Sequence, residues 1–237
     1  MCFKRVTDFK ILLSIITLFL WVTNVCATSK LIEGSQLKEP LTIDLDFSDT
    51  DHLLIRASQY HADYSLELIE KETSTIIRKV NFPFGNDIDE ILLVTTNQCK
   101  ECIVQLTPIE FIDTNSPYSL TIEAIPTTDI AQLAILQSLT LAGEYLQKTE
   151  EVINNDREVY LKKSAIELNV VADMDKAAWR NYALLLLAYI YRDSNNIELL
   201  KETLVKLLDE TTKKISNFRA YASVSYTHLT LPTTPYV

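Results

Sequence analysis

The sequence predicts an α+β protein with separate domains, an antiparallel β-sandwich followed by antiparallel helical pairs. Three observations predict this class. Apolar and polar residues alternate with a period of two in short runs as far as residue 126. Turn-prone stretches without a helical pattern separate these runs, which favours a sandwich. Beyond Pro126, apolar residues recur every three or four positions, as in amphipathic helices. We therefore expect a β-domain over 28–126 and a helical region over 127–223.

The N-terminus, residues 1–27, has the pattern of a signal peptide. A basic start precedes an apolar run from Ile11 to Val22, which is short for a membrane span. Val25 and Ala27 are small residues at the positions that signal peptidase reads, which predicts cleavage after Ala27. We therefore expect an exported protein, periplasmic or extracellular. Two alternatives stay open: an uncleaved membrane anchor, and a lipoprotein anchored through Cys26.

The charge of the chain limits its partners. The formal net charge is −10, and removal of the basic leader makes it more negative. An acidic chain repels nucleic acid phosphates and anionic lipid head groups. We expect no nucleic acid partner and, after leader cleavage, no membrane partner. Only 3 glycines occur, which argues against phosphate-binding glycine loops and predicts no cofactor.

The first strand is predicted between Leu41 and Phe47, where apolar residues at odd positions alternate with polar residues at even positions. Residues 82–87 are one of the turn-prone stretches that separate the later strands. Further runs rich in Ile, Leu, Val, Thr and Tyr predict strands at 52–58, 64–69, 75–81, 90–96, 103–107 and 118–125.

Asp44, Asp46, Asp49 and Asp51 are candidate calcium ligands, because hard cations bind carboxylate oxygens. Their spacing departs from the EF-hand loop, which has glycine where Asp49 stands and glutamate where Ile55 stands. We expect the first two on the solvent face of a strand and the other two in the following turn. The prediction is no metal site, with calcium as the alternative.

Cys99 and Cys102 are the cysteines that remain after loss of a leader containing Cys2 and Cys26. In an exported protein an isolated pair predicts a disulfide, here at the tip of a hairpin between two strands. Zinc needs about four ligands, and a redox Cys-x-x-Cys opens a helix. A reduced pair and a redox or metal role stay open as alternatives.

Four helices are predicted in the second half. The first begins at residues 127–129 and continues to about residue 148, and the second follows a polar break at 154–156 and continues through Val171. The third runs over about 176–192, and the fourth begins at Ile197 and ends near Lys213.

The third and fourth helices resemble a tetratricopeptide repeat (TPR), in which the small residue at Ala188 lets two helices approach closely. Leu200 departs from the repeat, which usually has a small residue there. Residues 160–182 would form an earlier, degenerate unit, and the alternative is a generic helical bundle with leucine-lined faces. The residues that carry the TPR-like packing are Leu184, Leu187, Ala188, Tyr191, Leu200, Leu204 and Leu207.

The order of leader, β-domain and helical repeats is similar to the N-terminal portion of bacterial CHAT-domain proteins, over roughly residues 35–215. The resemblance implies a sandwich akin to a pre-peptidase domain, then TPRs, then a caspase-like cysteine peptidase domain. That family's catalytic His and Cys lie in the last domain and have no counterpart here. His52, His61, His228 and Cys99 therefore carry no catalytic role, and no catalytic residue is predicted.

Residues 224–237 resemble the translation of a sequencing-library transposase adapter, with a residue-for-residue match from Val224 to Thr233. We expect this segment to be an artefact and the natural gene to continue past Ser223. The alternative is a genuine terminus rich in Thr and Pro.

Two function classes follow from these patterns. The first is an exported, non-catalytic scaffold that binds a protein or peptide through a groove of its TPR-like helices. The alternative is the regulatory N-terminal part of a CHAT-type cysteine peptidase whose catalytic domain is missing from this chain. A carbohydrate-binding sandwich has less support, because Phe47, Tyr64 and Tyr118 fall on apolar strand faces. We expect residues 28–223 to show no hydrolase activity.

Overall fold

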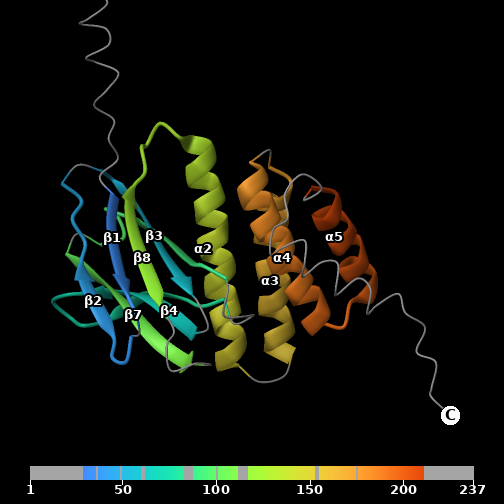
Figure 1. The fold of residues 1–237 in the computed structure, drawn as a ribbon, viewed down its shortest axis with the longest axis horizontal. Coiled ribbons are helices and arrows are strands. Elements are labelled where there is room, and N and C mark those ends of the chain that lie inside the picture. Colours follow the sequence, from blue (N-terminus) through green and yellow to red (C-terminus); the bar gives the residue numbers. More distant parts are fainter. Residues whose placement is uncertain are drawn as a thin grey trace, which may run out of the picture.

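The computed structural model describes residues 29–35, 37–48, 50–59, 62–82, 88–99, 101–111, 117–152, 155–174 and 176–210. Within these ranges the chain forms eight strands in two antiparallel sheets, followed by four helices (Figure 1). The predicted α+β class is therefore confirmed. The predicted leader and the adapter-like segment lie outside the described residues.

The strands divide equally between the two sheets, and neighbouring strands are antiparallel throughout. The first sheet has the order β1 (Ser29–Gly34), β8 (Tyr118–Ala124), β3 (His52–Gln59), β6 (Glu90–Thr95). The second sheet has the order β2 (Leu41–Asp44), β7 (Cys102–Phe111), β4 (Ala62–Glu70), β5 (Ile76–Val80).

The alternating pattern after residue 40 has the predicted effect on burial. Ile43 and Leu45 are buried, whereas Thr42, Asp44 and Asp46 are exposed. Every predicted strand is present within a few residues. Strand β1 was not predicted, because its six residues are mostly exposed and mix charged with apolar types. Its strand geometry comes from pairing with β8, a long-range contact that local sequence does not encode.

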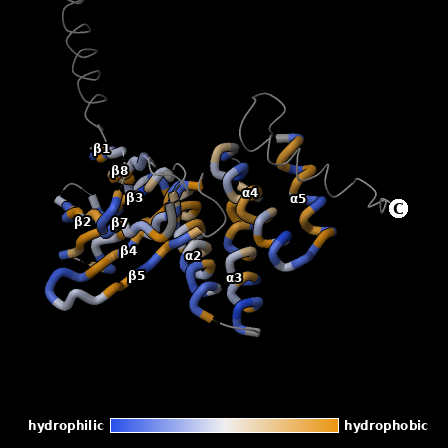
Figure 2. Tube along the Cα trace, turned by 60° about the horizontal axis from the view of Figure 1, so that its bottom comes forward, coloured by the Kyte–Doolittle hydropathy of each residue, from blue (hydrophilic) through white to orange (hydrophobic). Residues whose placement is uncertain are grey.

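Four helices follow the strands: α2 (Ile130–Glu151), α3 (Asn155–Ala172), α4 (Ala177–Asp193) and α5 (Ile197–Glu210). They begin close to the predicted positions. Asp129 caps α2, because its Oδ1 accepts a hydrogen bond of 3.0 Å from the backbone N–H of Gln132. Each helix contacts the next, so that α2 lies beside the sheets and α5 lies farthest from them (Figures 1 and 2). Among the described residues, no helix is both long enough and apolar enough to cross a membrane.

Helix α2 packs against β5 and β6, which are edge strands of different sheets. Gly143 permits this close approach. A Cβ atom at this position would lie 2.5 Å from Cγ1 of Val80 and 2.9 Å from Cζ of Phe82. The buried residues of the sheets and the helices belong to one hydrophobic cluster.

The free edge of β6 is satisfied by side chains. The backbone N–H of Leu93 donates to Oγ1 of Thr140 on α2, at 2.8 Å, and its carbonyl accepts from Arg78 on β5, at 3.3 Å. The N–H of Thr95 donates to the side chain of Gln98, at 3.0 Å. An open strand edge invites pairing with another chain, and at Leu93 and Thr95 these bonds occupy backbone groups that such pairing would use.

Candidate functional site

The predicted TPR-like residues lie on α4 and α5, which contact each other. All are buried except Tyr191, which is half-buried and packs against the core. Ala188 is fully buried. These residues lie on two helices that contact each other, and Tyr191 alone among them keeps part of its side chain exposed.

Cys99 and Cys102 lie with their Cα atoms 5.8 Å apart and their sulfur atoms at bonding distance. They occupy the connection between β6 and β7. The predicted hairpin is wrong, because β6 pairs with β3 in one sheet whereas β7 pairs with β2 and β4 in the other. A short connection between two strand-like runs does not reveal that the chain crosses between sheets.

The predicted solvent-face aspartates make local contacts. Asp44 pairs with Lys71 at 2.7 Å. Oδ1 of Asp46 accepts a bond of 2.9 Å from the backbone N–H of Ser48, and this bond lowers the pKa of the Asp46 carboxyl. Asp49 lies outside the described residues. Among the described residues, no group of His, Cys, Asp and Glu is arranged to hold a metal ion.

Of the histidines considered for catalysis, His52 is the one that lies among the described residues. His52 begins β3, and its Nδ1 is buried without a hydrogen-bond partner. It lines a pocket of about 230 Å³ with Arg78, whose guanidinium contacts Glu144 and the carbonyl of Leu93. His61 and His228 lie outside the described residues.

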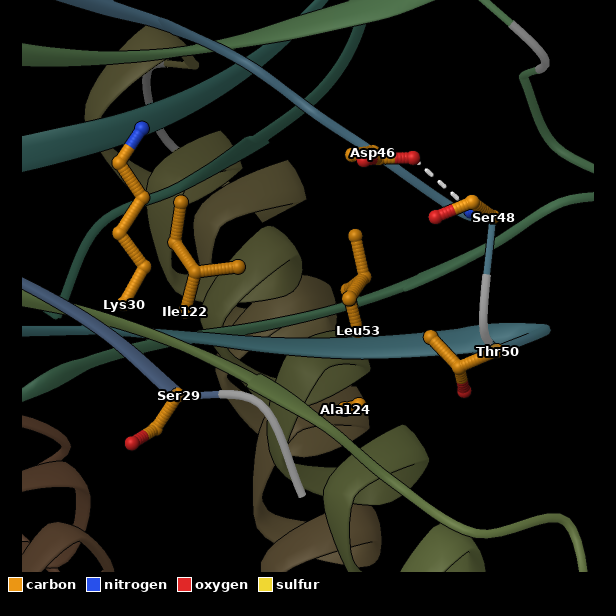
Figure 3. Close-up of a pocket in the computed structure, with 8 residues that line it drawn as sticks. All are labelled: Ser29, Lys30, Asp46, Ser48, Thr50, Leu53, Ile122 and Ala124. Carbon is orange, nitrogen blue, oxygen red and sulfur yellow. Dashed lines mark hydrogen bonds between the residues drawn. The ribbon is translucent and has the colours of Figure 1, made fainter. Parts of the chain in front are cut away.

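A second pocket, of about 170 Å³, lies between the ends of β1 and β8 and the segment before β3 (Figure 3). Its polar lining includes Lys30, Asp46, Ser48 and Thr50. The carboxylate of Asp46 points toward Ser48 (Figure 3). No ion pair joins Lys30 and Asp46 in this part of the chain, so the pocket offers no converging acid and base.

A third pocket, of about 500 Å³, lies beside the cysteine pair. Its lining includes Glu70, Glu72 and Glu101, with Cys99 at one side. Acidic residues are common in this chain, whose net charge is −10, so three glutamates in one lining are not unusual. Glu70 already accepts a hydrogen bond of 2.6 Å from the hydroxyl of Thr73. This pocket provides no nucleophile and base pair either.

Buried polar groups join α4 to the loop before β6. The hydroxyl of Tyr182 donates to the backbone carbonyl of Asp89. Burial raises the pKa of Tyr182 well above its ordinary value of 10.0, and the negative charges of Glu90 and Asp89 raise it further. Burial also raises the pKa of Asp89, which pairs with Arg56 at 3.9 Å. These contacts hold the helices on the sheets.

The strongest candidate site is a surface formed by α2 and α3. The rings of Tyr145 on α2 and Tyr160 on α3 stack with centroids 6.4 Å apart and planes inclined by 26°. The Nζ of Lys148 lies 6.0 Å and 5.7 Å from the two centroids. The Nζ of Lys163 lies 5.7 Å and 5.3 Å from them. Two ammonium groups therefore contact the same pair of aromatic rings.

Both lysines of this cluster lack a carboxylate partner. Lys148 and Lys163 are exposed and form no ion pair with any described residue. Other exposed lysines on the helices are paired: Lys162 contacts Glu158 at 2.7 Å, and Lys206 contacts Glu202 at 2.8 Å. On the helices, Lys148 and Lys163 therefore differ from these two paired lysines.

An apolar stripe extends the cluster along α3. Val159, Ile166 and Val170 are 47%, 63% and 44% exposed. Together with Lys163 they follow spacings of four, three and four residues, which places them on one face of the helix. The opposite face, with Leu161 and others, is buried in the core. We call the two tyrosines, the two lysines and this stripe the α2–α3 surface.

A sequence signal for this surface exists, although it was not among the predicted features. Tyr145-Leu-Gln-Lys148 on α2 and Tyr160-Leu-Lys-Lys163 on α3 repeat the pattern Tyr-Leu-x-Lys. Tyrosine and lysine three positions apart lie on the same helical face, while the leucine between them is buried in both helices. The repeat indicates two equivalent faces, but their contact across the helix pair needs the fold.

Comparison with known proteins does not assign a family: no family model matches the chain, and no curated protein matches it.

Proposed function

We propose that this chain is an exported, non-catalytic protein-interaction module. In this proposal the β-region is a sandwich that serves as a base, and TPR-like helices present the binding surface. The observation that carries the proposal is the α2–α3 surface, where aromatic rings, unpaired cations and exposed apolar side chains occur together. Tyrosine is enriched at protein interfaces because it combines an apolar ring with a polar tip.

The apolar stripe on α3 supports this proposal. A helix that packs only against its own core needs one apolar face. Helix α3 carries apolar residues on its buried face and on its solvent face. Exposed apolar area that is contiguous and rimmed by polar groups is typical of interaction sites. Stability of this chain alone gives no reason for Ile166 to be apolar.

Contacts within the structure also support the proposed sandwich and the proposed TPR-like helices. Contacts between β3 and β4, and between β4 and β6, join the two sheets, as a sandwich requires. The successive antiparallel contacts of α2 to α5 are compatible with TPR-like stacking, and Ala188 lies at zero exposure where the repeat has its small residue. The order of these parts remains similar to the front of CHAT-domain proteins.

The proposal of no catalysis can be tested directly. The whole chain should show no peptide hydrolysis beyond that of its Cys99→Ser and His61→Ala variants. Hydrolysis that either substitution abolishes would establish an enzyme and refute this part of the proposal. The expectation has a chemical reason, because peptide hydrolysis needs an activated nucleophile and a site for an oxyanion.

The binding proposal is tested by selection from a random peptide display library on the immobilised whole chain. We expect enriched peptides that no longer bind an Ile166→Asp variant but still bind Val205→Asp. Val205 is a matched control, because it is an exposed apolar residue on α5. Absence of enrichment, or peptides that both variants bind equally, would contradict the proposed function.

A further inference from the structure

We propose that the α2–α3 surface recognises an acidic segment of a partner protein, one that carries carboxylates beside apolar side chains. This inference rests on the proposed function and specifies the chemistry of the partner. It assigns Lys148 and Lys163 as the groups that bind carboxylates, and Ile166 and its neighbours as the apolar contact.

The first argument is the state of the two ammonium groups. Each lies within 6.0 Å of both ring centroids, so the π faces of Tyr145 and Tyr160 hold the lysine side chains in place. An ammonium group has three donors, and a ring face does not satisfy all of them. A carboxylate from a partner would accept the remaining hydrogens at little conformational cost, because the lysines are already positioned.

The second argument concerns the nearby carboxylates of the chain. Glu144 pairs with Arg78, and Glu158 pairs with Lys162. Glu150 and Glu151 accept bonds from the side chains of Asn81 and Gln147, at 3.1 Å and 3.2 Å. Glu167, one turn beyond Lys163, pairs with neither lysine of the cluster. The chain therefore has carboxylates close by but does not use them to neutralise these two cations.

The third argument selects a protein segment over other anions. The chain has a net charge of −10, so a long polyanion such as nucleic acid would be repelled over most of its length. An anionic membrane would meet the same repulsion. A short peptide can place a few carboxylates on the lysines and its apolar side chains on the stripe of α3. The mixture of lysine with Val159, Ile166 and Val170 matches such a ligand.

The test uses two display libraries of random peptides and the whole chain. The libraries are identical except at a few fixed positions, which hold glutamate in one and lysine in the other. We expect enrichment from the glutamate library, and affinity that falls as salt is raised. Enrichment from the lysine library with none from the glutamate library would overturn the inference, although the proposed function would stand.

Variants locate the contact. For the enriched glutamate peptides, we expect Lys148→Gln/Lys163→Gln to weaken binding at least about tenfold at low salt and to reduce the salt dependence. Ile166→Ser should weaken binding about fivefold without changing the salt dependence. The charge-matched control is Lys71→Gln/Lys206→Gln, which removes two exposed lysines on other elements and should leave affinity within about twofold.

The outcomes separate the two proposals. Acidic peptides that bind the double lysine variant as tightly as the parent chain would overturn the assignment of these lysines. Failure of both libraries would overturn both the inference and the proposed function. Far-ultraviolet circular dichroism of each variant checks that it is folded, and we expect no change because all the substituted lysines are exposed.

Discussion

Helix α2 turns one face toward strands β5 and β6 and another, together with α3, toward solvent. On the first face polar side chains have partners on the neighbouring strands: Thr140 bonds to Leu93, and Glu144 pairs with Arg78. On the second face, two lysines lie on aromatic rings without a carboxylate. The same helix thus combines a partnered structural contact with an unpartnered surface. On these helices the paired Glu144 and the unpaired Lys148 therefore lie on different faces.

The largest expected effect on stability comes from the face of α2 that packs against β5 and β6. Gly143→Leu places a side chain where a Cβ alone would lie 2.5 Å from Val80. We expect the free energy of unfolding to fall by about 3 kcal/mol, because overpacking forces the helix from the sheets. Thermal unfolding should show it as a drop of about 6–12 °C. Ala131→Leu, at an exposed position of α2, is the control and should change little; a loss as large as that of Gly143→Leu would contradict the assignment of the two faces.

A smaller effect should follow from removal of one hydrogen bond on the same face. Thr140→Val keeps the shape of the side chain but leaves the N–H of Leu93 without its acceptor. A buried, unsatisfied donor costs about 2 kcal/mol of stability. Denaturant unfolding measures this loss, and hydrogen exchange should show a faster Leu93 amide. Thr128→Val, at an exposed threonine before α2, should be neutral. Unchanged stability in Thr140→Val would mean that the Leu93 N–H does not depend on the Thr140 hydroxyl as its acceptor.

The Cys99–Cys102 pair lies in the connection between β6 and β7, where a disulfide would constrain only a short segment of chain. We predict that exported protein carries the Cys99–Cys102 disulfide, with a two-hydrogen deficit in the spanning peptide by mass spectrometry. Because the bond closes a very short loop, its loss in Cys99→Ser/Cys102→Ser should cost at most about 2 kcal/mol. Complete alkylation of both thiols in freshly isolated protein would refute the prediction.

Alkaline pH should weaken the contact between α4 and the sheets. The pKa of Tyr182 is raised in the folded state, so folding favours the protonated phenol. Its contribution to stability is present below the ordinary pKa near 10.0 and is lost as the pH rises above it. Tyr182→Phe loses the bond to Asp89, worth about 1 kcal/mol near neutral pH. The variant should nevertheless lose less stability than the parent between about pH 8 and pH 11; an equal loss would show that Tyr182 does not titrate on unfolding.

The smallest effect on stability is expected from substitutions on the α2–α3 surface. Lys148→Gln/Lys163→Gln should change the free energy of unfolding by less than about 0.5 kcal/mol, because exposed substitutions rarely affect stability more. Differential scanning calorimetry of the double variant beside Gly143→Leu makes the comparison direct. A loss comparable to that of Gly143→Leu would mean that the lysines serve the fold.

The sequence predicted local structure better than it predicted contacts. The alternation around Ile43 and Leu45 and the helical periodicity beyond residue 126 are local patterns, and both gave correct elements. The missed strand β1 and the mistaken hairpin at Cys99 depend on pairings between distant segments. The same limit applies to the candidate site. The Tyr-Leu-x-Lys repeat is visible in the sequence, but stacking of Tyr145 on Tyr160 requires that α2 and α3 pack side by side.

Hydrogen exchange of the whole chain, with and without an enriched acidic peptide, would show directly which surface binds the partner. We predict slower exchange at the C-terminal end of α2, around Tyr145, and along α3 from Tyr160 to Val170. Strands β1 and β2 and helix α5 should be unchanged. Protection confined to those strands or to α5, with none on α2 and α3, would contradict the proposal that the α2–α3 surface binds the partner.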